Sequence, residues 1–438
     1  MSIQLVTLCL FGSLFLLLAL GMPVAFALGG VTAVFAYLLW GPEAFYIIPS
    51  KFLGILTSPV LMAIPLFLLM AYMLQHSGVA DALFETLYQW MGGLRGGLAI
   101  ATVIICTLFA AISGISGAAT VTMGVVALPA MLERKYDKTI ALGCISAGGV
   151  LGIVIPPSVE MVLYSLFSRP HISVGKMFFG GVVPGLIISS MHITYIGVRS
   201  YIQPHLGPAV PPEERANLRK KIISLRSVVL PIILVTGVLG SIYTGAATPT
   251  EAAAVGAMGA FICATVNRRL NWHSVHKSAL GTLKTSGMCM WIAGMCVAFN
   301  GLYIGLGAQK MVIELISGLA VNPWVILIGM QLTLFFFGMV MDDYAIVMLC
   351  APIYAPVVAS LGFDPLWWGI VFILNMQMAY LTPPFGFNLF YLRGVAPKGV
   401  TMGDIYRSVI PFVIIQAVGL AIIMVFPRLA LWLPGMMI

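Results

Sequence analysis

Charged residues are scarce in this 438-residue chain, where they make up 8% of the sequence against 61% for hydrophobic residues. A soluble globular domain usually carries roughly a quarter charged residues, so the composition excludes a water-soluble fold. The apolar residues form long continuous runs, such as 5–20, 228–242 and 411–425, whereas a transmembrane β-barrel would show short alternating segments. The sequence therefore predicts an all-α polytopic membrane protein.

Several signatures of other protein classes are also missing. The first 20 residues lack a basic start and a small-residue cleavage site, so we interpret them as a membrane helix and not as a signal peptide. The seven cysteines include no C-x-x-C pair and are expected to be small core residues, and the six histidines show no metal-ligand spacing. There is no G-x-x-x-x-G-K-[ST] loop, so nucleotide hydrolysis is not expected.

The net charge of +8 is explained by membrane topology and not by nucleic-acid binding. The densest basic segment, 215–226, lies in the only long polar connection, which the positive-inside rule places in the cytoplasm. If 96–132 and 321–359 are re-entrant hairpins, counting crossings puts both termini outside and 17 of the 22 lysines and arginines inside. The basic residues left outside are Lys51, Arg169, Lys176, Lys310 and Arg428. Each half then has five full spans, and this odd number gives the halves opposite orientations.

An internal repeat at an offset near 227 residues supports this division. The matched positions are Pro156-Pro157 with Pro383-Pro384, Tyr164 with Tyr391, and Pro184 with Pro411. Chance matches are common in apolar sequence, but a nearly constant offset through paired prolines is not. We predict two inverted repeats, 1–200 and 228–438, joined by a cytoplasmic connection at 201–227. Such repeats are typical of secondary transporters, whose sites lie on interrupted helices at the midplane.

Small residues interrupt the apolar sequence at 109–122 (FAAISGISGAATVT), where the backbone can turn back within the membrane. Irregular backbone at membrane depth is tolerated only where it is buried in protein or lines a wet cavity. Hydroxyl and carbonyl groups at Ser113, Ser116 and Thr120 are hard oxygen ligands suited to a hard cation. The matching tip at 338–345 (GMVMDDYA) carries carboxylates instead.

Two proline pairs interrupt other apolar segments, at 148–158 (GGVLGIVIPPS) and 381–388 (LTPPFGFN). Proline removes a backbone donor and clashes with the preceding turn, so the first helix is predicted to unwind near 152–156. Carbonyls freed before Pro156 can coordinate a cation, and amides near Ser158 can face an anion. Glycine and proline also serve helix packing in membranes. The recurrence of tips and breaks in both halves favours the functional interpretation.

Carboxylates within apolar sequence are functional candidates by default. Asp342 and Asp343 lie in the second tip, and Glu160 follows the first break, where a helix-start role is an equal alternative. Glu251 follows Thr-Pro-Thr, a position at which a carboxylate caps a helix. Apart from Lys284 near an inner end, no lysine or arginine lies within a predicted span, so a bound anion would rely on dipoles, hydroxyls and a nearby cation. This pattern favours coupling to a cation.

These segments resemble the large membrane subunit, the DctM-like permease, of tripartite ATP-independent periplasmic (TRAP) transporters. The resemblance runs from about residue 10 to residue 422. Its pieces are GMPVAFALGG, IPLFLLMA, SGISGAA, LGIVIPPS, TPTEAAAVGA and LTPPFGFNLF. It implies an elevator-type sodium symporter of the ion transporter superfamily, located in the bacterial inner membrane. It also implies three partners: a small four-helix membrane subunit, a periplasmic substrate-binding protein and a small organic anion.

The resemblance places sodium and substrate at the two tips and the two breaks. The predicted sodium ligands are Ser113, Gly114, Gly152, Val154, Pro156, Gly338, Met341, Asp342, Thr382 and Pro383. The predicted substrate-binding residues are Ser116, Thr120, Ser158, Thr382 and Asn388. Ile115 departs from the usual SGSS-like tip, which favours ligation by carbonyls over ligation by side chains there.

The sequence leaves alternative functions to be tested. One is a stand-alone sodium/dicarboxylate symporter or an antiporter of the same superfamily. Another is an intramembrane enzyme using Asp342 and Asp343, but adjacent residues on a helix point about 100° apart, so an enzyme is not expected. No motif selects the organic acid, and sialic acids, C4-dicarboxylates and keto acids all fit.

Overall fold

The computed structural model describes residues 2–318 and 321–437, and this part of the chain is helical without β-strands. The α-helices are α1 (Ile3–Ala19), α2 (Val24–Trp40), α3 (Ile47–Leu56), α4 (Ala63–Gln75), α5 (Val79–Met91), α6 (Gly97–Ser113), α7 (Ser116–Glu133), α8 (Lys138–Gly149), α9 (Val159–Phe167), α10 (Val174–Ile202), α11 (Leu218–Ser224), α12 (Arg226–Tyr243), α13 (Pro249–Val266), α14 (Trp272–Gly305), α15 (Ala308–Ser317), α16 (Pro323–Val340), α17 (Asp343–Ser360), α18 (Pro365–Ala379), α19 (Phe387–Val395), α20 (Met402–Val425) and α21 (Arg428–Leu431). Short 3-10 helices are η1 (Pro42–Tyr46), η2 (Pro59–Met62), η3 (Val150–Ile153), η4 (Pro204–Leu206), η5 (Pro212–Glu214) and η6 (Pro434–Met436).

The prediction of a polytopic helical membrane protein is confirmed. Among the described residues, eight helices are long and apolar enough to cross a membrane, and the bent pair at 42–56 and 59–75 would make a ninth. Large apolar side chains cover the outside: on α12, for example, Val229, Ile232 and Ile233 are all exposed. Such a surface is compatible with lipid, because each helix satisfies its own backbone hydrogen bonds. All seven cysteines are free, and six are buried as expected, whereas Cys9 is exposed.

The order of elements repeats between the two halves of the chain. The hairpin α6–α7 precedes the interrupted pair α8 and α9, and the hairpin α16–α17 precedes the interrupted pair α18 and α19. Ser116 and Asp343, which begin α7 and α17, are separated by the same 227 residues as Pro156 and Pro383. Both helices that follow, α10 and α20, are long. The register found in the sequence therefore coincides with helix boundaries.

One pair of matching segments differs between the halves. In the first half, the segment 42–75 is bent by 60° between Leu56 and Pro59. In the second half, the corresponding α14 is one continuous helix of 34 residues. Pro59 accounts for the bend, because proline removes a backbone donor and clashes with the preceding turn, whereas α14 contains no proline.

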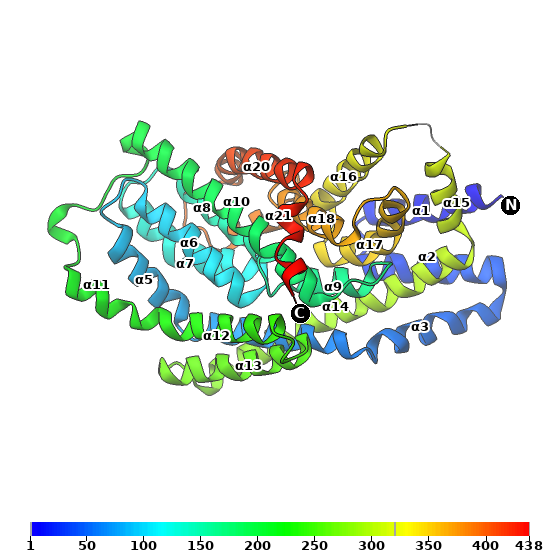
Figure 1. Cartoon of the computed structure of the whole chain (residues 1–438), viewed down its shortest axis with the longest axis horizontal. Helices are drawn as coiled ribbons and strands as arrows, with labels where there is room; N and C mark the ends of the chain where they lie inside the picture. The colour runs from blue at the N-terminus through cyan, green and yellow to red at the C-terminus, as the bar shows by residue number, and fades with distance from the viewer. Residues whose placement is uncertain (1, 319–320, 438) are drawn as a thin grey trace.

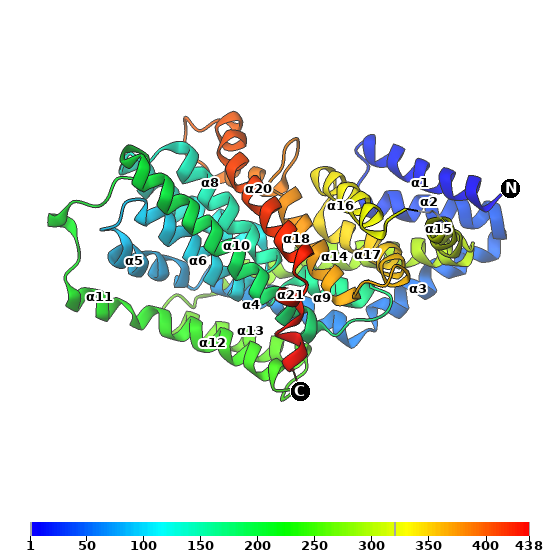
Figure 2. The same cartoon turned by 45° about the horizontal axis from the view of Figure 1, so that its top comes forward.

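The helices pack into two groups, which we call the peripheral group and the hairpin group. In the peripheral group, α4 packs against α13 and α14, and α14 also packs against α2 and α3. In the hairpin group, α8 packs against α6, α7 and α20, while α18 packs against α16 and α20. Figure 1 shows α12 and α13 along the lower left edge and α3 at the lower right, with α10, α20 and α16 above them. The turned view in Figure 2 keeps α12 and α13 at the lower left.

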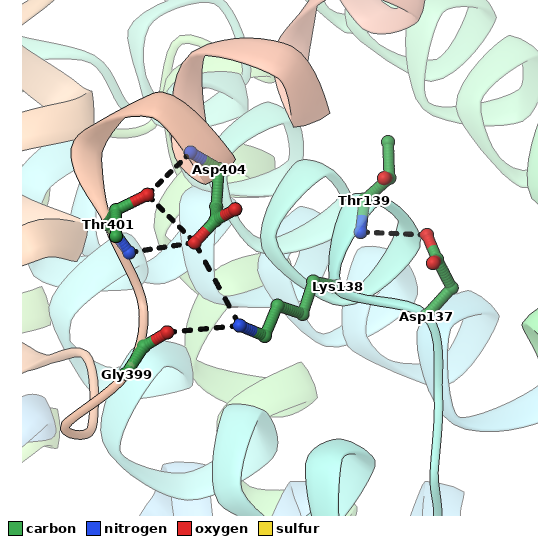
Figure 3. Close-up of polar contacts among 6 residues, drawn as sticks. All are labelled: Asp137, Lys138, Thr139, Gly399, Thr401 and Asp404. Atoms are coloured by element: carbon green, nitrogen blue, oxygen red, sulfur yellow. Dashed lines mark hydrogen bonds and ion pairs between the residues drawn. The ribbon is translucent and has the colours of Figure 1, made fainter.

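A hydrogen bond and an ion pair connect the start of α8 to the segment that begins α20 within the hairpin group (Figure 3). Lys138 Nζ donates to the Gly399 carbonyl oxygen at 3.0 Å and lies 3.9 Å from Asp404 Oδ2. The same Asp404 carboxylate completes a capping box with Thr401 at the start of α20. At the start of α8, Asp137 Oδ1 accepts from the Thr139 amide at 2.8 Å. Segments from the two halves of the sequence thus form one packed body.

Candidate functional site

The first hairpin tip packs against the first proline break. Helix α6 ends at Ser113, Gly114 has a φ of 61°, and α7 begins at Ser116. The Val159 amide donates to the Gly114 carbonyl oxygen at 3.5 Å. A Cβ atom on Gly114 would lie 2.1 Å from the Pro157 carbonyl oxygen, and one on Gly152 would lie 3.0 Å from the Ile115 carbonyl carbon. Only glycine permits this approach of two backbones.

The first break has the predicted irregular backbone. Helix α8 ends at Gly149, η3 covers 150–153, and α9 begins only at Val159. Ser158 caps α9: its Oγ accepts from the Met161 amide at 3.4 Å and donates to the Ile153 carbonyl oxygen at 2.6 Å. Ser113 Oγ donates weakly to the Ile115 carbonyl oxygen at 3.4 Å. Four of the predicted residues, Ser113, Gly114, Gly152 and Ser158, therefore lie where tip and break meet.

Val154 and Pro156 belong to the same break but show a different environment. A Cβ atom on Gly181 of α10 would lie 2.4 Å from the Val154 carbonyl oxygen, so this carbonyl packs against α10. Pro156 is buried within the turn that precedes α9. Of these two predicted sodium ligands, Val154 therefore directs its carbonyl toward α10.

The second tip and the second break repeat the arrangement. Helix α16 ends at Val340, and α17 begins at Asp343. A Cβ atom on Gly338 would lie 2.4 Å from Ala379 Cβ, at the last residue of α18. Thr382 follows directly in the break, where its Oγ1 donates to the Met378 carbonyl oxygen at 2.9 Å. Gly338, Met341, Asp342, Thr382 and Pro383 are thus grouped where the second tip meets the second break.

A buried polar bridge joins the two halves of the hairpin group. Thr120 Oγ1 on α7 donates to Asn388 Oδ1 on α19 at 2.6 Å. Asn388 Nδ2 in turn donates to the Ser146 carbonyl oxygen on α8 at 2.9 Å. Thr120 and Asn388 were both predicted as substrate-binding residues, and the structure shows them bonded to each other behind the first tip.

A cavity of about 240 Å³ lies between the two tips, the second break and the peripheral helices α4 and α14. It is lined by Tyr72, Gln75, Ile115, Ser116, Gly117, Ala118, Val121, Thr285, Met288, Asp342, Asp343, Tyr344, Tyr380 and Tyr391. Of the predicted site residues, Ser116 and Asp342 reach this cavity. Its other polar lining residues from α4 and α14 belong to no motif in the sequence, because only the tertiary packing brings those helices to the tips.

Carboxylates and tyrosines form a connected polar cluster beside the cavity. The Asp343 carboxyl group lies beside Glu160, at the start of α9, and beside Tyr380, and Asp343 Oδ1 accepts from the Tyr344 amide at 2.9 Å. Tyr380 in turn lies beside Tyr391, whose ring lies 2.9 Å from where a Cβ atom on Gly117 would stand. Within the described part of the chain, Glu160 Oε1 and Asp342 Oδ2 have no hydrogen-bond partner. Residues of both halves therefore contribute to one electronegative site.

The oxygen atoms at the tips and breaks fit a hard monovalent cation better than a transition metal. Among the described residues, no group of three or more histidine, cysteine or carboxylate side chains is arranged to hold a metal ion. Hydroxyl and backbone carbonyl oxygens occur instead at the first tip, and carboxylate and backbone carbonyl oxygens at the second. Glu160 Oε1 and Asp342 Oδ2 are buried carboxylate oxygens with no partner among the described residues. Oxygen ligands of this kind are those that hard cations prefer.

Comparisons with known proteins agree with this arrangement. The family model of the tripartite ATP-independent periplasmic transporter, DctM component, matches residues 11–429. The C4-dicarboxylate TRAP transporter large permease protein of Pseudomonas aeruginosa is 34% identical over 407 residues, which cover 93% of each chain. The isethionate TRAP transporter permease protein DctMQ of Oleidesulfovibrio alaskensis is 30% identical, and the match covers 97% of this chain and 66% of that protein.

A solved structure shares the fold. The YdaH transporter of Alcanivorax borkumensis superposes with a TM-score of 0.65, over 97% of this chain and 98% of that chain. The two sequences are only 12% identical, so this likeness concerns the arrangement of helices alone.

Proposed function

The chain belongs to the DctM component family of tripartite ATP-independent periplasmic transporters, and on this premise we propose that it is the transporting subunit of a sodium-coupled importer of a small organic acid. It is a multi-pass membrane protein, and its proposed location is the bacterial inner membrane. The observation that supports this function most strongly is the pair of hairpin tips, each packed against a proline break, around one cavity. Transporters place their sites on interrupted helices of this kind.

Sodium is the proposed coupling ion, with one group of ligands in each half. In the first half, Ser113, Gly114 and Gly152 supply carbonyl and hydroxyl oxygens, with Val154 and Pro156 in the same break. In the second half, the ligands are Gly338, Met341, Thr382 and Pro383, together with Asp342. The bound ion would add positive charge beside the cavity, whose lining includes Ser116, Gly117 and Ala118 at the start of α7. Backbone amides at a helix start favour an anion.

The elevator mechanism is proposed from the position of the cavity. Tyr72 and Gln75 belong to the peripheral group, whereas the tips and the second break belong to the hairpin group. Movement of the hairpin group past α4 and α14 would carry solute and sodium together from one side of the membrane to the other. The repeated order of helices is consistent with two inverted repeats, which supply the two alternative states in such transporters.

The proposed partners are a small membrane subunit and a periplasmic binding protein. The match covers 66% of the DctMQ relative, and the family to which this chain belongs supports the proposal of a small membrane subunit as its partner. Relatives are named for C4-dicarboxylate, isethionate, sialic acid and ectoine, so the substrate class is a small organic acid. The alternative is a stand-alone symporter or antiporter, which would need neither partner.

Reconstitution in proteoliposomes tests the proposal by leaving out one component at a time. We expect solute uptake to require an inward sodium gradient, the small membrane subunit and the binding protein. Uptake with a potassium gradient alone would contradict sodium coupling. Sodium-driven uptake without the binding protein would favour the stand-alone symporter.

Matched variants test the proposed ion ligands. Ser113→Ala and Thr382→Val should raise the sodium concentration for half-maximal uptake at least tenfold, because each removes an oxygen atom at a tip or break. Thr122→Val is the control, since Thr122 Oγ1 bonds only to the Ala118 carbonyl oxygen of its own helix, at 2.7 Å. An unchanged sodium dependence in both site variants would remove these residues from the ion site.

A further inference from the structure

The charge of the cavity is opposite to what a simple organic dianion requires. Asp342 and Asp343 line it, and none of its described lining residues is a lysine, arginine or histidine. Glu160 stands directly behind Asp343, is only 1% exposed, and leaves its Oε1 atom without a hydrogen-bond partner among the described residues. A buried carboxylate is costly when ionised unless a positive group pairs with it, and a cationic ligand in the cavity would supply that group.

The carboxylates differ in whether their oxygen atoms already have hydrogen-bond partners. Asp343 Oδ1 already accepts from the Tyr344 amide at 2.9 Å, and the Asp343 side chain lies beside Glu160 and Tyr380. Asp342, by contrast, lines the cavity while its Oδ2 atom has no partner in the described structure. Asp342 therefore combines a position in the cavity lining with an acceptor atom that no described residue satisfies.

Aromatic rings surround the same space. Tyr72, Tyr344, Tyr380 and Tyr391 all line the cavity. Tyr380 is held in a stacked pair with Phe387, with ring centroids 5.6 Å apart. Tyrosine faces attract ammonium and quaternary ammonium groups, and clusters of such rings recognise them. The cavity therefore has both elements of a site for a cationic nitrogen: a carboxylate with an oxygen atom that no described residue satisfies, and several tyrosine side chains in its lining.

A different part of the lining suits a carboxylate. Ser116, Gly117 and Ala118 form the first turn of the 18-residue helix α7, whose N-cap residue Ile115 makes no side-chain cap hydrogen bond. The amides of a first helical turn have no partner within their helix and favour negative charge. The cavity thus presents an anion-binding helix start and a cation-binding carboxylate with tyrosines within one volume of about 240 Å³.

We propose that the organic acid carried by this chain also bears a cationic nitrogen, so that the substrate is a small zwitterion. This inference rests on the proposed function and narrows its substrate class. Asp342 and the tyrosines bind the ammonium or quaternary ammonium group, and the start of α7 binds the carboxylate. This inference revises the ion site proposed above: Asp342 binds the solute, and the sodium ligands of the second half are Gly338, Met341, Thr382 and Pro383. The volume lies below the roughly 300–1,000 Å³ of drug-sized sites, which fits a small solute.

Uptake by the complete reconstituted transporter under a sodium gradient tests the substrate class. One set of labelled probes comprises the zwitterions glycine betaine, ectoine and γ-aminobutyrate, and the other comprises the anions succinate, malate and pyruvate. We expect at least one zwitterion to be taken up ten times faster than every anion. Sodium-driven uptake of an anion with no zwitterion carried would overturn the inference and leave the proposed function standing. Absence of sodium-driven uptake in both sets would contradict both.

Variants of the cavity test the assigned contacts. Asp342→Asn should raise the KM for the carried zwitterion at least tenfold and leave the sodium half-saturation within twofold of the wild type. Glu314→Gln, which alters an exposed carboxylate on α15, should change neither quantity. A shift in sodium half-saturation without a change in KM would make Asp342 an ion ligand and overturn the assignment.

A second pair of variants keeps the test decisive if Asp342→Asn does not fold. Tyr391→Phe retains the ring and should keep KM within about threefold of the wild type, whereas Tyr391→Leu removes the ring face and should raise KM at least tenfold. Equal KM values in these two variants would show that the ring does not bind the nitrogen.

Discussion

At the scale of single residues, the site depends on positions where no larger side chain fits. A Cβ atom on Gly149 would lie 1.8 Å from Thr120 Oγ1, one on Gly114 would meet the first break, and one on Gly338 would meet Ala379 at the end of α18. The same glycines are therefore needed for two reasons: they allow close packing, and they allow the irregular backbone. The small residues of the tips serve packing, and that packing positions the carbonyl oxygens proposed to bind sodium.

Gly114→Ala should destabilise the first tip. The substitution places a methyl group 2.1 Å from the Pro157 carbonyl oxygen at a φ of 61°, and a strained backbone position of this kind costs about 1–3 kcal/mol. We expect a lower unfolding temperature of the purified protein and a loss of uptake. Gly329→Ala on α16, where a Cβ atom meets nothing within 4 Å, should leave both unchanged. Equal stability of the two variants would contradict the packing described for the tip.

Thr120→Val should weaken the bridge between α7 and α19. It leaves Asn388 Oδ1 buried without the donor now at 2.6 Å, and an unsatisfied buried polar group costs about 1–3 kcal/mol. Thr122→Val, on the same helix, is the matched control. Thermal unfolding of Thr120→Val, Asn388→Leu and the double variant would measure the coupling, which we expect to be about 0.6 kcal/mol or more. Additive effects would show that the two side chains do not act as a pair.

Residues that act locally were predictable from the sequence, and residues that act across the fold were not. Pro156, Pro383 and Gly114 were identified because each changes the backbone at its own position. Tyr72 and Thr285 were missed because nothing in their own segments distinguishes them. They reach the cavity only through the packing of α4 and α14 against the hairpin tips.

At the scale of elements, breaks and caps follow the sequence closely. The unwound segment after α8 and the second tip at Met341 and Asp342 lie within the predicted ranges, and both predictions are confirmed. Glu251 forms a capping box with Thr248, which confirms its interpretation as a helix-start residue. The connection at 201–227 contains η4, η5 and α11, short elements whose contacts with the first half the polar sequence did not reveal.

The Arg134–Glu214 ion pair should hold this connection against the end of α7 in a pH-dependent way. The hydrogen bond from Arg134 lowers the pKa of Glu214 below its ordinary value. The contact is therefore present above that ordinary pKa and is lost as pH falls through the lowered one. We expect amide hydrogen exchange in 204–217 to be faster in Glu214→Gln than in the wild type at pH 7, and equal at about pH 3.

Glu213→Gln is the control for this ion pair, because it changes the neighbouring carboxylate and keeps Arg134 and Glu214. Its exchange rates should match those of the wild type at both pH values. If Glu213→Gln and Glu214→Gln accelerate exchange equally, the specific contact with Arg134 does not hold the connection.

At the scale of the whole molecule, the cavity lies between two groups of helices that are interleaved in the sequence. The hairpin group takes α6 to α10 from the first half and α16 to α20 from the second. The repeat predicted which segments correspond, but not which helices of the peripheral group face them, because that depends on side-chain packing between distant segments. The proposed elevator movement requires these two groups to slide past each other.

Cross-linking the two groups should stop transport. In a variant without native cysteines, Phe67→Cys on α4 and Phe178→Cys on α10 replace rings whose centroids are 6.0 Å apart across the two groups. A reducible bifunctional cross-linker should lower uptake at least tenfold, and reduction should restore it. Phe11→Cys on α1, which packs against α2 of the peripheral group, and Phe299→Cys on α14 replace rings 5.6 Å apart. Cross-linking there should leave uptake intact. Full uptake in both cross-linked proteins would contradict the movement.

Sodium flux is the most direct measure of the central claim that this chain couples solute import to sodium. The complete transporter in proteoliposomes would be given labelled solute together with ²²Na⁺, and both influxes would be recorded in the same vesicles. We predict that solute increases ²²Na⁺ influx in a constant ratio and that Thr382→Val reduces both influxes together. Accumulation of solute with no accompanying ²²Na⁺ influx would contradict the account.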